Sequence, residues 1–182
     1  MSDAVSVLNG ASFDGFAKVS DTGPRGMITL RGAPEVLAKM AGALGVDLPE
    51  TLGVITAGNV SLAWLSPDEV MVLCDYSAAP DLAAKAEAAV PGDHALVAVV
   101  SDARAVFAIK GAKADQVLRK LTPAPLDGFA PGTIRRTRLA QVAGAFWMTD
   151  AGTFEVMCFR SQAQYVYDLL TNAAKPGSEL DL

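Results

Sequence analysis

Three arginines, Arg135, Arg136 and Arg138, form the densest group of chemically capable side chains in this 182-residue sequence. A guanidinium presents a planar fork of donors that suits a carboxylate or an acidic surface. On a strand, Arg136 and Arg138 would project from one face and Arg135 from the other. Two interpretations stay open: the arginines contact an anion or an acidic partner, or their charge protects an exposed strand edge from mispairing.

Other candidates for acid–base or nucleophilic chemistry are sparse. Asp68 and Glu69 are adjacent, but we expect them in an exposed hairpin turn. A carboxyl group there is not buried, so its pKa is not raised as a general acid requires. Cys74 and Cys158 are isolated and are expected to be small buried hydrophobes. His94 precedes an apolar run without a nucleophile motif, which favours a strand-entry residue over a general base. We therefore expect no catalytic residue in this chain.

Metal and nucleotide motifs are also missing from the sequence. No CxxC or HExxH spacing is present, so a zinc site is not expected. The two glycine-bearing turns read RGAPEV and KGAKAD, and neither matches the G-x-G-x-x-G pattern of a dinucleotide site. P-loop and nucleophile-elbow motifs are absent as well. We expect neither a metal nor a cofactor on this chain.

Composition narrows the class of protein further. Apolar residues make up 51% of the chain and charged residues 19%, which predicts a packed interior. The net charge of −5 disfavours binding to nucleic acid. No apolar stretch approaches the roughly 20 residues that a membrane-spanning helix needs. The start MSDAVSVLNG does not resemble a signal peptide, so the expected location is cytoplasmic.

The sequence contains an internal repeat of predicted elements. In each half, a strand ends at a glycine, a helix follows, a second glycine opens an extended segment, and a hairpin and a closing helix complete the series. Matched pairs lie 79 to 84 positions apart: Gly32 and Gly111, Gly53 and Gly132, Trp64 and Trp147, and Cys74 and Cys158. The repeat predicts that the members of each pair occupy equivalent structural positions.

The predicted order is β-α-β-β-β-α twice, joined by Ala95–Val100 as a fully buried strand. Such an order builds a sheet covered on one face by helices, so the expected fold class is α+β, a two-layer sandwich of two pseudo-repeats. The predicted divisions are an N-terminal extension (1–25), a first lobe (26–92), a second lobe (93–174) and a solvated tail (175–182).

Taken together, these segments resemble the gamma subunit of bacterial heterotetrameric sarcosine oxidase over about residues 26–174. No single motif is specific, but the order and spacing of the motifs are. The segments that carry the resemblance are Gly26–Gly32, Trp64–Glu69, Ser101, Arg104–Phe107, Gly111, Pro131-Gly132, Arg136–Leu139, Phe154-Glu155, Arg160-Ser161, Ala163 and Tyr165.

The resemblance implies a fold like the folate-binding domain of glycine-cleavage T-proteins. It also implies a complex of alpha, beta, gamma and delta subunits. That complex demethylates sarcosine oxidatively to glycine, with formation of hydrogen peroxide and 5,10-methylenetetrahydrofolate. In such a complex FAD, FMN, NAD and tetrahydrofolate reside on the partner subunits, and the gamma subunit contributes no known catalytic residue.

The leading hypothesis is therefore a non-catalytic subunit that supports assembly of the large subunits, because a chain without redox groups can serve an oxidase only beside a partner that holds them. The alternative is a stand-alone folate-binding module in which Arg136 or Arg138 pairs with folate carboxylates. An independent aminomethyltransferase would need a pocket carboxylate, and none stands out.

Overall fold

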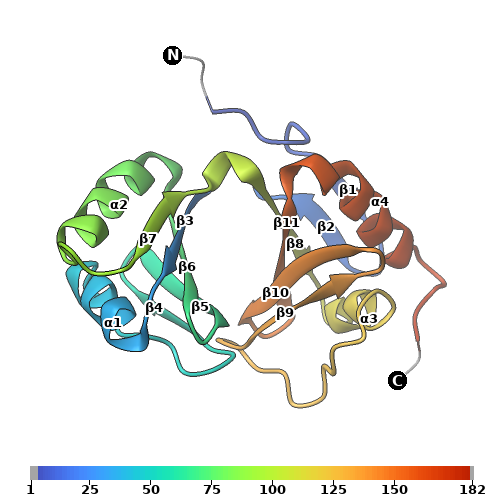
Figure 1. The fold of residues 1–182 in the computed structure, drawn as a ribbon. Helices are drawn as coiled ribbons and strands as arrows, with labels where there is room; N and C mark the ends of the chain where they lie inside the picture. Colours follow the sequence, from blue (N-terminus) through green and yellow to red (C-terminus); the bar gives the residue numbers. More distant parts are fainter. Residues whose placement is uncertain (1–3, 181–182) are drawn as a thin grey trace. The chain divides into compact units, whose positions relative to one another are not determined.

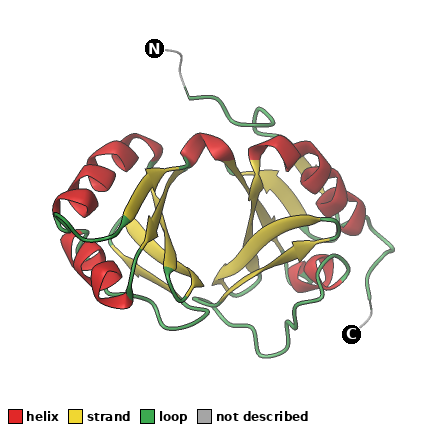
Figure 2. Cartoon of the chain, in the orientation of Figure 1, coloured by secondary structure: helices red, strands yellow, loops and turns green. Residues whose placement is uncertain are grey.

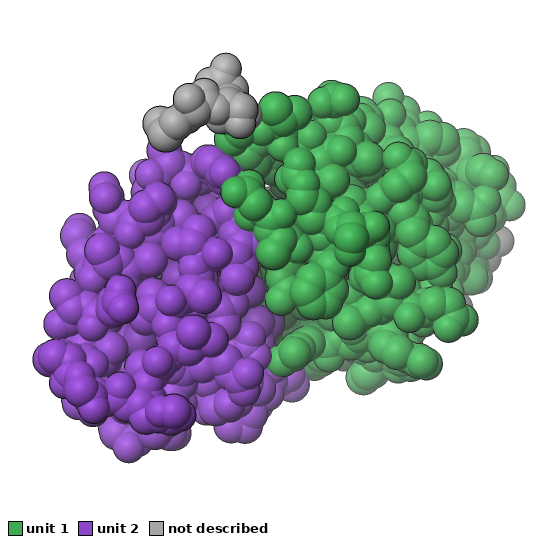
Figure 3. Space-filling model, turned by 45° about the horizontal axis from the view of Figure 1, so that its top comes forward, with its two compact units in different colours: residues 1–24, 102–182 green, residues 25–101 purple. Residues whose placement is uncertain are grey.

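The computed structural model describes residues 4–180 and divides the chain into two compact units (Figure 3). Unit 2 is the continuous segment 25–101, whereas unit 1 combines the residues up to 24 with the residues from 102 onward. Within residues 4–180, no helix is long and apolar enough to span a membrane.

Unit 2 contains one antiparallel sheet of five strands in the order β4-β5-β6-β3-β7, with two helices on one face (Figure 1). Its elements are β3 (Gly26–Arg31), α1 (Pro34–Ala43), β4 (Val54–Ala57), β5 (Val60–Ser66), β6 (Glu69–Cys74), α2 (Ala79–Ala88) and β7 (Leu96–Val99).

Unit 1 contains an antiparallel sheet of six strands in the order β1-β2-β8-β11-β10-β9, again with helices on one face (Figure 2). Its elements are β1 (Ser12–Asp14), β2 (Lys18–Asp21), β8 (Arg104–Lys110), α3 (Ala114–Arg119), β9 (Ile134–Leu139), β10 (Val142–Asp150), β11 (Thr153–Phe159) and α4 (Ala163–Ala173). The predicted α+β fold with helices on one face of a sheet is confirmed.

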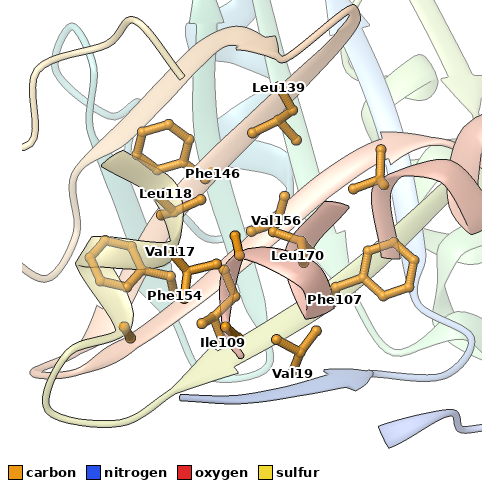
Figure 4. Packing of buried hydrophobic residues seen from close by; sticks show 14 of the residues in the cluster. Val19, Phe107, Ile109, Val117, Leu118, Leu139, Phe146, Phe154, Val156 and Leu170 are labelled. Carbon is orange, nitrogen blue, oxygen red and sulfur yellow. The ribbon is translucent and has the colours of Figure 1, made fainter. Parts of the chain in front are cut away.

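The helices form where apolar residues recur at helical spacing behind a suitable start. Pro34 occupies the first turn of α1, where its missing N–H leaves no helical bond unmade, and Val36, Leu37 and Met40 are buried against the sheet. In unit 1, α3 and α4 bury the equivalent stripes in a core that contains three fully buried phenylalanines (Figure 4). They are Phe107, Phe146 and Phe154.

The central strand pairs of the two sheets have matching registers. Gly26 lies opposite Cys74 in β3 and β6, and Ala105 lies opposite Cys158 in β8 and β11. Cys74 and Cys158 therefore occupy corresponding positions, each buried in the core of its unit. Whether a duplication produced this correspondence stays a prediction.

The tryptophans do not occupy equivalent positions, contrary to the prediction. Trp147 lies opposite Glu155 in β11, whereas Trp64 lies opposite Val70 in β6. The flanking residues Phe146 and Leu62 belong to the core clusters, so alternation places Trp147 on the sheet face away from the helices and Trp64 on the helix side. The tryptophans are 83 positions apart, whereas the corresponding residues Cys74 and Cys158 are 84 apart, and this difference of one residue places the two tryptophans on opposite faces of their sheets.

Two strands, β2 and β7, explain why the units differ from the predicted lobes. β2, from the predicted N-terminal extension, pairs with β8 of unit 1, and β7, from the predicted second lobe, pairs with β3 of unit 2. Lys18 lies opposite Lys110 and Leu96 lies opposite Arg31, so the two strands hold corresponding places. The strand that precedes each predicted repeat thus completes the sheet of the other repeat.

The structure corrects one further prediction, and it adds contacts to the predicted solvated tail, in which residues 175–177 and 180 are exposed. β7 is an edge strand, and Leu96 and Val99 are 49% and 48% exposed, so Ala95–Val100 is not a fully buried strand. The described part of the C-terminal segment, 175–180, is held by unit 1. Lys120 donates to the carbonyl oxygen of Ala173 and to Ser178, and the Leu180 N–H donates to Gln116. This segment is therefore anchored at both ends.

Replacing Val19 with alanine tests whether β2 is part of the core of unit 1. Val19 is fully buried, so Val19→Ala should destabilise the protein by about 2 kcal/mol through lost methyl burial and the remaining cavity. The measurement is urea unfolding followed by circular dichroism. Val5→Ala is the matched control, because Val5 is 59% exposed. Equal unfolding midpoints for both variants would show that β2 is a dispensable extension.

Candidate functional site

The predicted arginine group lies on β9, at one edge of the sheet of unit 1. Arg136 and Arg138 are exposed, whereas Arg135 is partly buried. The Arg135 guanidinium carbon lies 5.3 Å from the ring centroid of Phe129, and Nη1 donates to the Ile134 carbonyl oxygen at 2.9 Å. The two-face arrangement expected of a strand is present.

The position of β9 gives each open interpretation a structural basis. As an edge strand without a neighbour on one side within the described residues, β9 has a side that charge would protect from mispairing. Arg136 and Arg138 also lie on the sheet face away from the helices, since Leu139 on the other face packs into the core. Arg136 and Arg138 are exposed and Arg135 is partly buried, so Arg136 and Arg138 are the two better suited to a partner.

Sequence reasoning missed one further cation on the same sheet face. Arg104, on β8, lies opposite Phe159, and its guanidinium carbon is 4.0 Å from the Phe159 ring centroid. Strands β11 and β10 separate β8 from β9, and the registers place Arg104 level with Arg138, so these two residues are about 14 Å apart across the sheet and cannot clamp one carboxylate. The alternation of side chains along the strand Arg104–Lys110 could have indicated that Arg104 lies on the face away from the helices.

Unit 2 has an open groove of about 590 Å³ where the turn after β3 meets the hairpin between β5 and β6. Arg31 and Asp68 form an ion pair at its rim, with Nη2 and Oδ2 2.6 Å apart, and Ser66 Oγ donates to Oδ1 of Asp68 at 2.6 Å. His94 and the exposed Leu96 complete the rim. The groove therefore combines a satisfied ion pair with apolar surface.

Asp68 and Glu69 differ in their exposure, although the sequence analysis expected both in an exposed turn. Asp68 lies in the turn as expected, and the hydrogen bond from Ser66 and the pairing with Arg31 lower its pKa to about 2. Glu69 starts β6 and is only 9% exposed, so the expectation of an exposed turn is wrong for it. Because Asp68 stays ionised at neutral pH, it cannot act as a general acid.

The thiols offer no activated nucleophile. Burial raises the pKa of Cys158 to about 12 and also raises the pKa of Cys74. Both side chains are free and buried, so they remain protonated and apolar, as expected of small hydrophobes. In the part of the chain that the structure describes, no three His, Cys, Asp or Glu side chains are grouped to hold a metal ion.

The fold defines a class: this chain is an α+β protein with a fold like that of an aminomethyltransferase. The glycine cleavage system aminomethyltransferase T from Bartonella henselae superposes with a TM-score of 0.64 over 86% of this chain and 45% of that chain. The identity of 15% means that this likeness shows the fold alone.

Residues 31–176 match the sarcosine oxidase, gamma subunit family. The sarcosine oxidase subunit gamma of Arthrobacter sp. is 31% identical over 76% of this chain and 71% of its own length. The subunit gamma of Corynebacterium sp. (strain P-1) is 31% identical over 75% and 68%. This chain belongs to the sarcosine oxidase gamma subunit family, as its sequence resemblance indicated.

A solved structure adds to this assignment. The heterotetrameric sarcosine oxidase from Corynebacterium sp. U-96, in complex with pyrrole 2-carboxylate, contains a chain that superposes with a TM-score of 0.80. The match has 26% identity and covers 87% of this chain and 83% of that chain.

Replacing Ser66 with alanine tests the electrostatics of the groove. Ser66→Ala should raise the pKa of Asp68 from about 2 toward the ordinary value of 3.8, because a hydrogen bond to the charged form is lost. Carboxyl-carbon NMR titration measures the shift. Since the folded-state pKa lies below the unfolded value, the stabilisation is present above pH 4 and lost as the pH falls toward 2.

Lys39→Ala is the control for this titration, because Lys39 pairs with Asp93 at 2.8 Å and not with Asp68. A pKa of Asp68 that moves equally in both variants would contradict the local cause.

Proposed function

We propose that this chain is a non-catalytic gamma subunit that assembles with the other subunits of a heterotetrameric sarcosine oxidase. The observation that carries the proposal is the structural match to a chain of the Corynebacterium enzyme, which covers most of both chains. The matched residues include both units, from Arg31 to Pro176, so the likeness is not confined to one motif.

In this proposal the redox chemistry belongs to the partner subunits, alpha, beta and delta. The complex would convert sarcosine, oxygen and tetrahydrofolate into glycine, hydrogen peroxide and 5,10-methylenetetrahydrofolate, in the cytoplasm. FAD, FMN, NAD and tetrahydrofolate would be bound by those subunits, which would bring the electron-transfer groups that the complex requires.

The two strand-to-helix turns of this chain support that division, because they do not fit a dinucleotide. Pro34 in the first turn of α1 removes a backbone N–H that a phosphate group would use. The corresponding helix α3 has six residues and begins after Lys113 without a side-chain cap. A helix this short offers only a small dipole to a pyrophosphate.

Co-expression with the other sarcosine oxidase subunits of the same genome tests the proposal. The expected result is one flavin-containing complex that retains this chain through size-exclusion chromatography, while the chain purified alone is colourless. Calorimetric titration of the isolated chain with tetrahydrofolate should show no binding. A chain that elutes separately from a fully active complex would contradict the proposed role.

Within this role we assign Arg136 and Arg138 to contact with an acidic partner surface. The double variant Arg136→Glu/Arg138→Glu should weaken retention in the complex by roughly tenfold, because like charges at an interface repel. The control Lys113→Glu/Lys175→Glu changes the net charge equally at positions away from β9. Equal retention of both double variants would assign the arginines to edge protection instead.

A further inference from the structure

Strand β7 leaves one edge of the sheet of unit 2 open at a place that is covered in unit 1. β2 holds the corresponding place in unit 1 and pairs with β8 on one side and with β1 on the other. Across the described residues 4–180, β7 pairs with β3 alone. The same structural position is thus completed by a strand in one unit and unoccupied in the other.

The side chains of β7 do not protect this edge. Its sequence, LVAV, has no charged residue, and Leu96 and Val99 are about half exposed. Natural edge strands usually carry charges, proline or a bulge that prevents further pairing. The edge strand β9 of unit 1, for comparison, contains three arginines. β4, the other edge of unit 2, corresponds to β9, which is also an unpaired edge. Only at β7 does the counterpart have a covering strand.

The backbone of β7 offers hydrogen bonds in a defined pattern. The Val100 N–H donates to the Met27 carbonyl oxygen at 2.8 Å, and hydrogen-bonded positions alternate along an antiparallel pair. The N–H and C=O groups of Val97 and Val99 therefore point away from β3. These groups are the donors and acceptors that an added strand would use.

The acidic side chains around β7 favour an added strand that carries a positive charge. One side of β7 borders the groove of about 590 Å³ described above, and the other borders a groove of about 310 Å³ that is lined by Glu87, Val90, Asp93 and Val97. Asp93 pairs with Lys39, while Glu87 is exposed. Unit 2 has four basic and nine acidic side chains, so its net charge of −5 equals that of the whole chain.

The geometry points to β7 as a docking edge for an extended, mainly apolar segment that carries a lysine or arginine, supplied by another subunit of the sarcosine oxidase complex. Alternate side chains of the segment would enter the two grooves, and its cation would face Glu87. This inference rests on the proposed function. A second copy of this chain fits less well, because pairing two β7 strands would bring two Glu87 carboxylates and two acidic units together.

Hydrogen exchange at single-amide resolution tests the inference on the free chain and on the co-expressed complex. The amides of Val97 and Val99 should exchange at least tenfold more slowly in the complex, because an added strand closes them off from water. The Thr56 amide, which faces outward from β4 by the same alternation, is the reference and should keep its rate. Unchanged rates at Val97 and Val99 in an intact complex would overturn the inference and leave the proposed function standing.

Variants provide an independent measurement. Val99→Pro removes an outward N–H while leaving the bonds to β3, and it should weaken retention of this chain by about tenfold. Thr56→Pro is the matched control on the opposite edge. Glu87→Lys should weaken retention, whereas Glu50→Lys, an equal charge change on an exposed loop of unit 2, should not. Should Val99→Pro fail to fold by circular dichroism, the exchange rates and the Glu87 pair still decide.

The remaining outcomes are separable. If the chain does not enter any complex, the proposed function fails before β7 is tested. If sedimentation shows a dimer of the free chain with Val97 and Val99 already closed to exchange, the occupant is a second copy and the inference is overturned.

Discussion

The exchange of strands β2 and β7 between the two repeats is the constraint on which the rest of the structure depends. β2 completes the sheet of unit 1 from a position almost ninety residues before its partner β8, and β7 completes the sheet of unit 2 from the start of the second repeat. Each pairing closes a long loop, which costs conformational entropy before contacts repay it. In unit 1 the burial of Ala17 and Val19 in the core offsets part of this entropy cost.

The chain ends are fixed by polar contacts that follow from this exchange. Asp21, at the end of β2, accepts hydrogen bonds from Ser6 and from the N–H groups of Leu8 and Gly23. Burial raises the pKa of Asp21, but these hydrogen bonds together lower it below its ordinary value. At the other end, Lys120 lies 4.8 Å from the ring centroid of Phe16 and donates to the end of α4. The first and last described segments of unit 1 are therefore held against its sheet and helices.

The sequence predicted the parts of the fold that depend on local patterns. Helix α1 follows from Pro34 and an apolar stripe, and the two hairpins follow from turn residues such as Pro67 and Gly152. β2 was missed because a four-residue strand, KVSD, carries no local signal for a partner far along the chain. β7 was misread because an apolar run indicates a strand but not its place in the sheet. At the candidate site, the alternation of Arg135 and Arg136 was predictable, whereas the contact between Arg104 and Phe159 required the pairing of β8 with β11.

Because of this exchange of strands, the two units differ in how completely the edges of their sheets are covered. In unit 1, strand β1 covers β2, and the other edge strand, β9, carries three arginines. In unit 2 the strand that would cover β7 has no counterpart in the described sequence, because β1 precedes β2 whereas the residues before β7 form helix α2 and a turn. Within the described residues, the grooves of unit 2 contain no activated thiol, and the acidic side chains beside β7 are Asp93, which is paired with Lys39, and the exposed Glu87. An open strand edge with acidic neighbours instead suits a protein whose role is to be held by others.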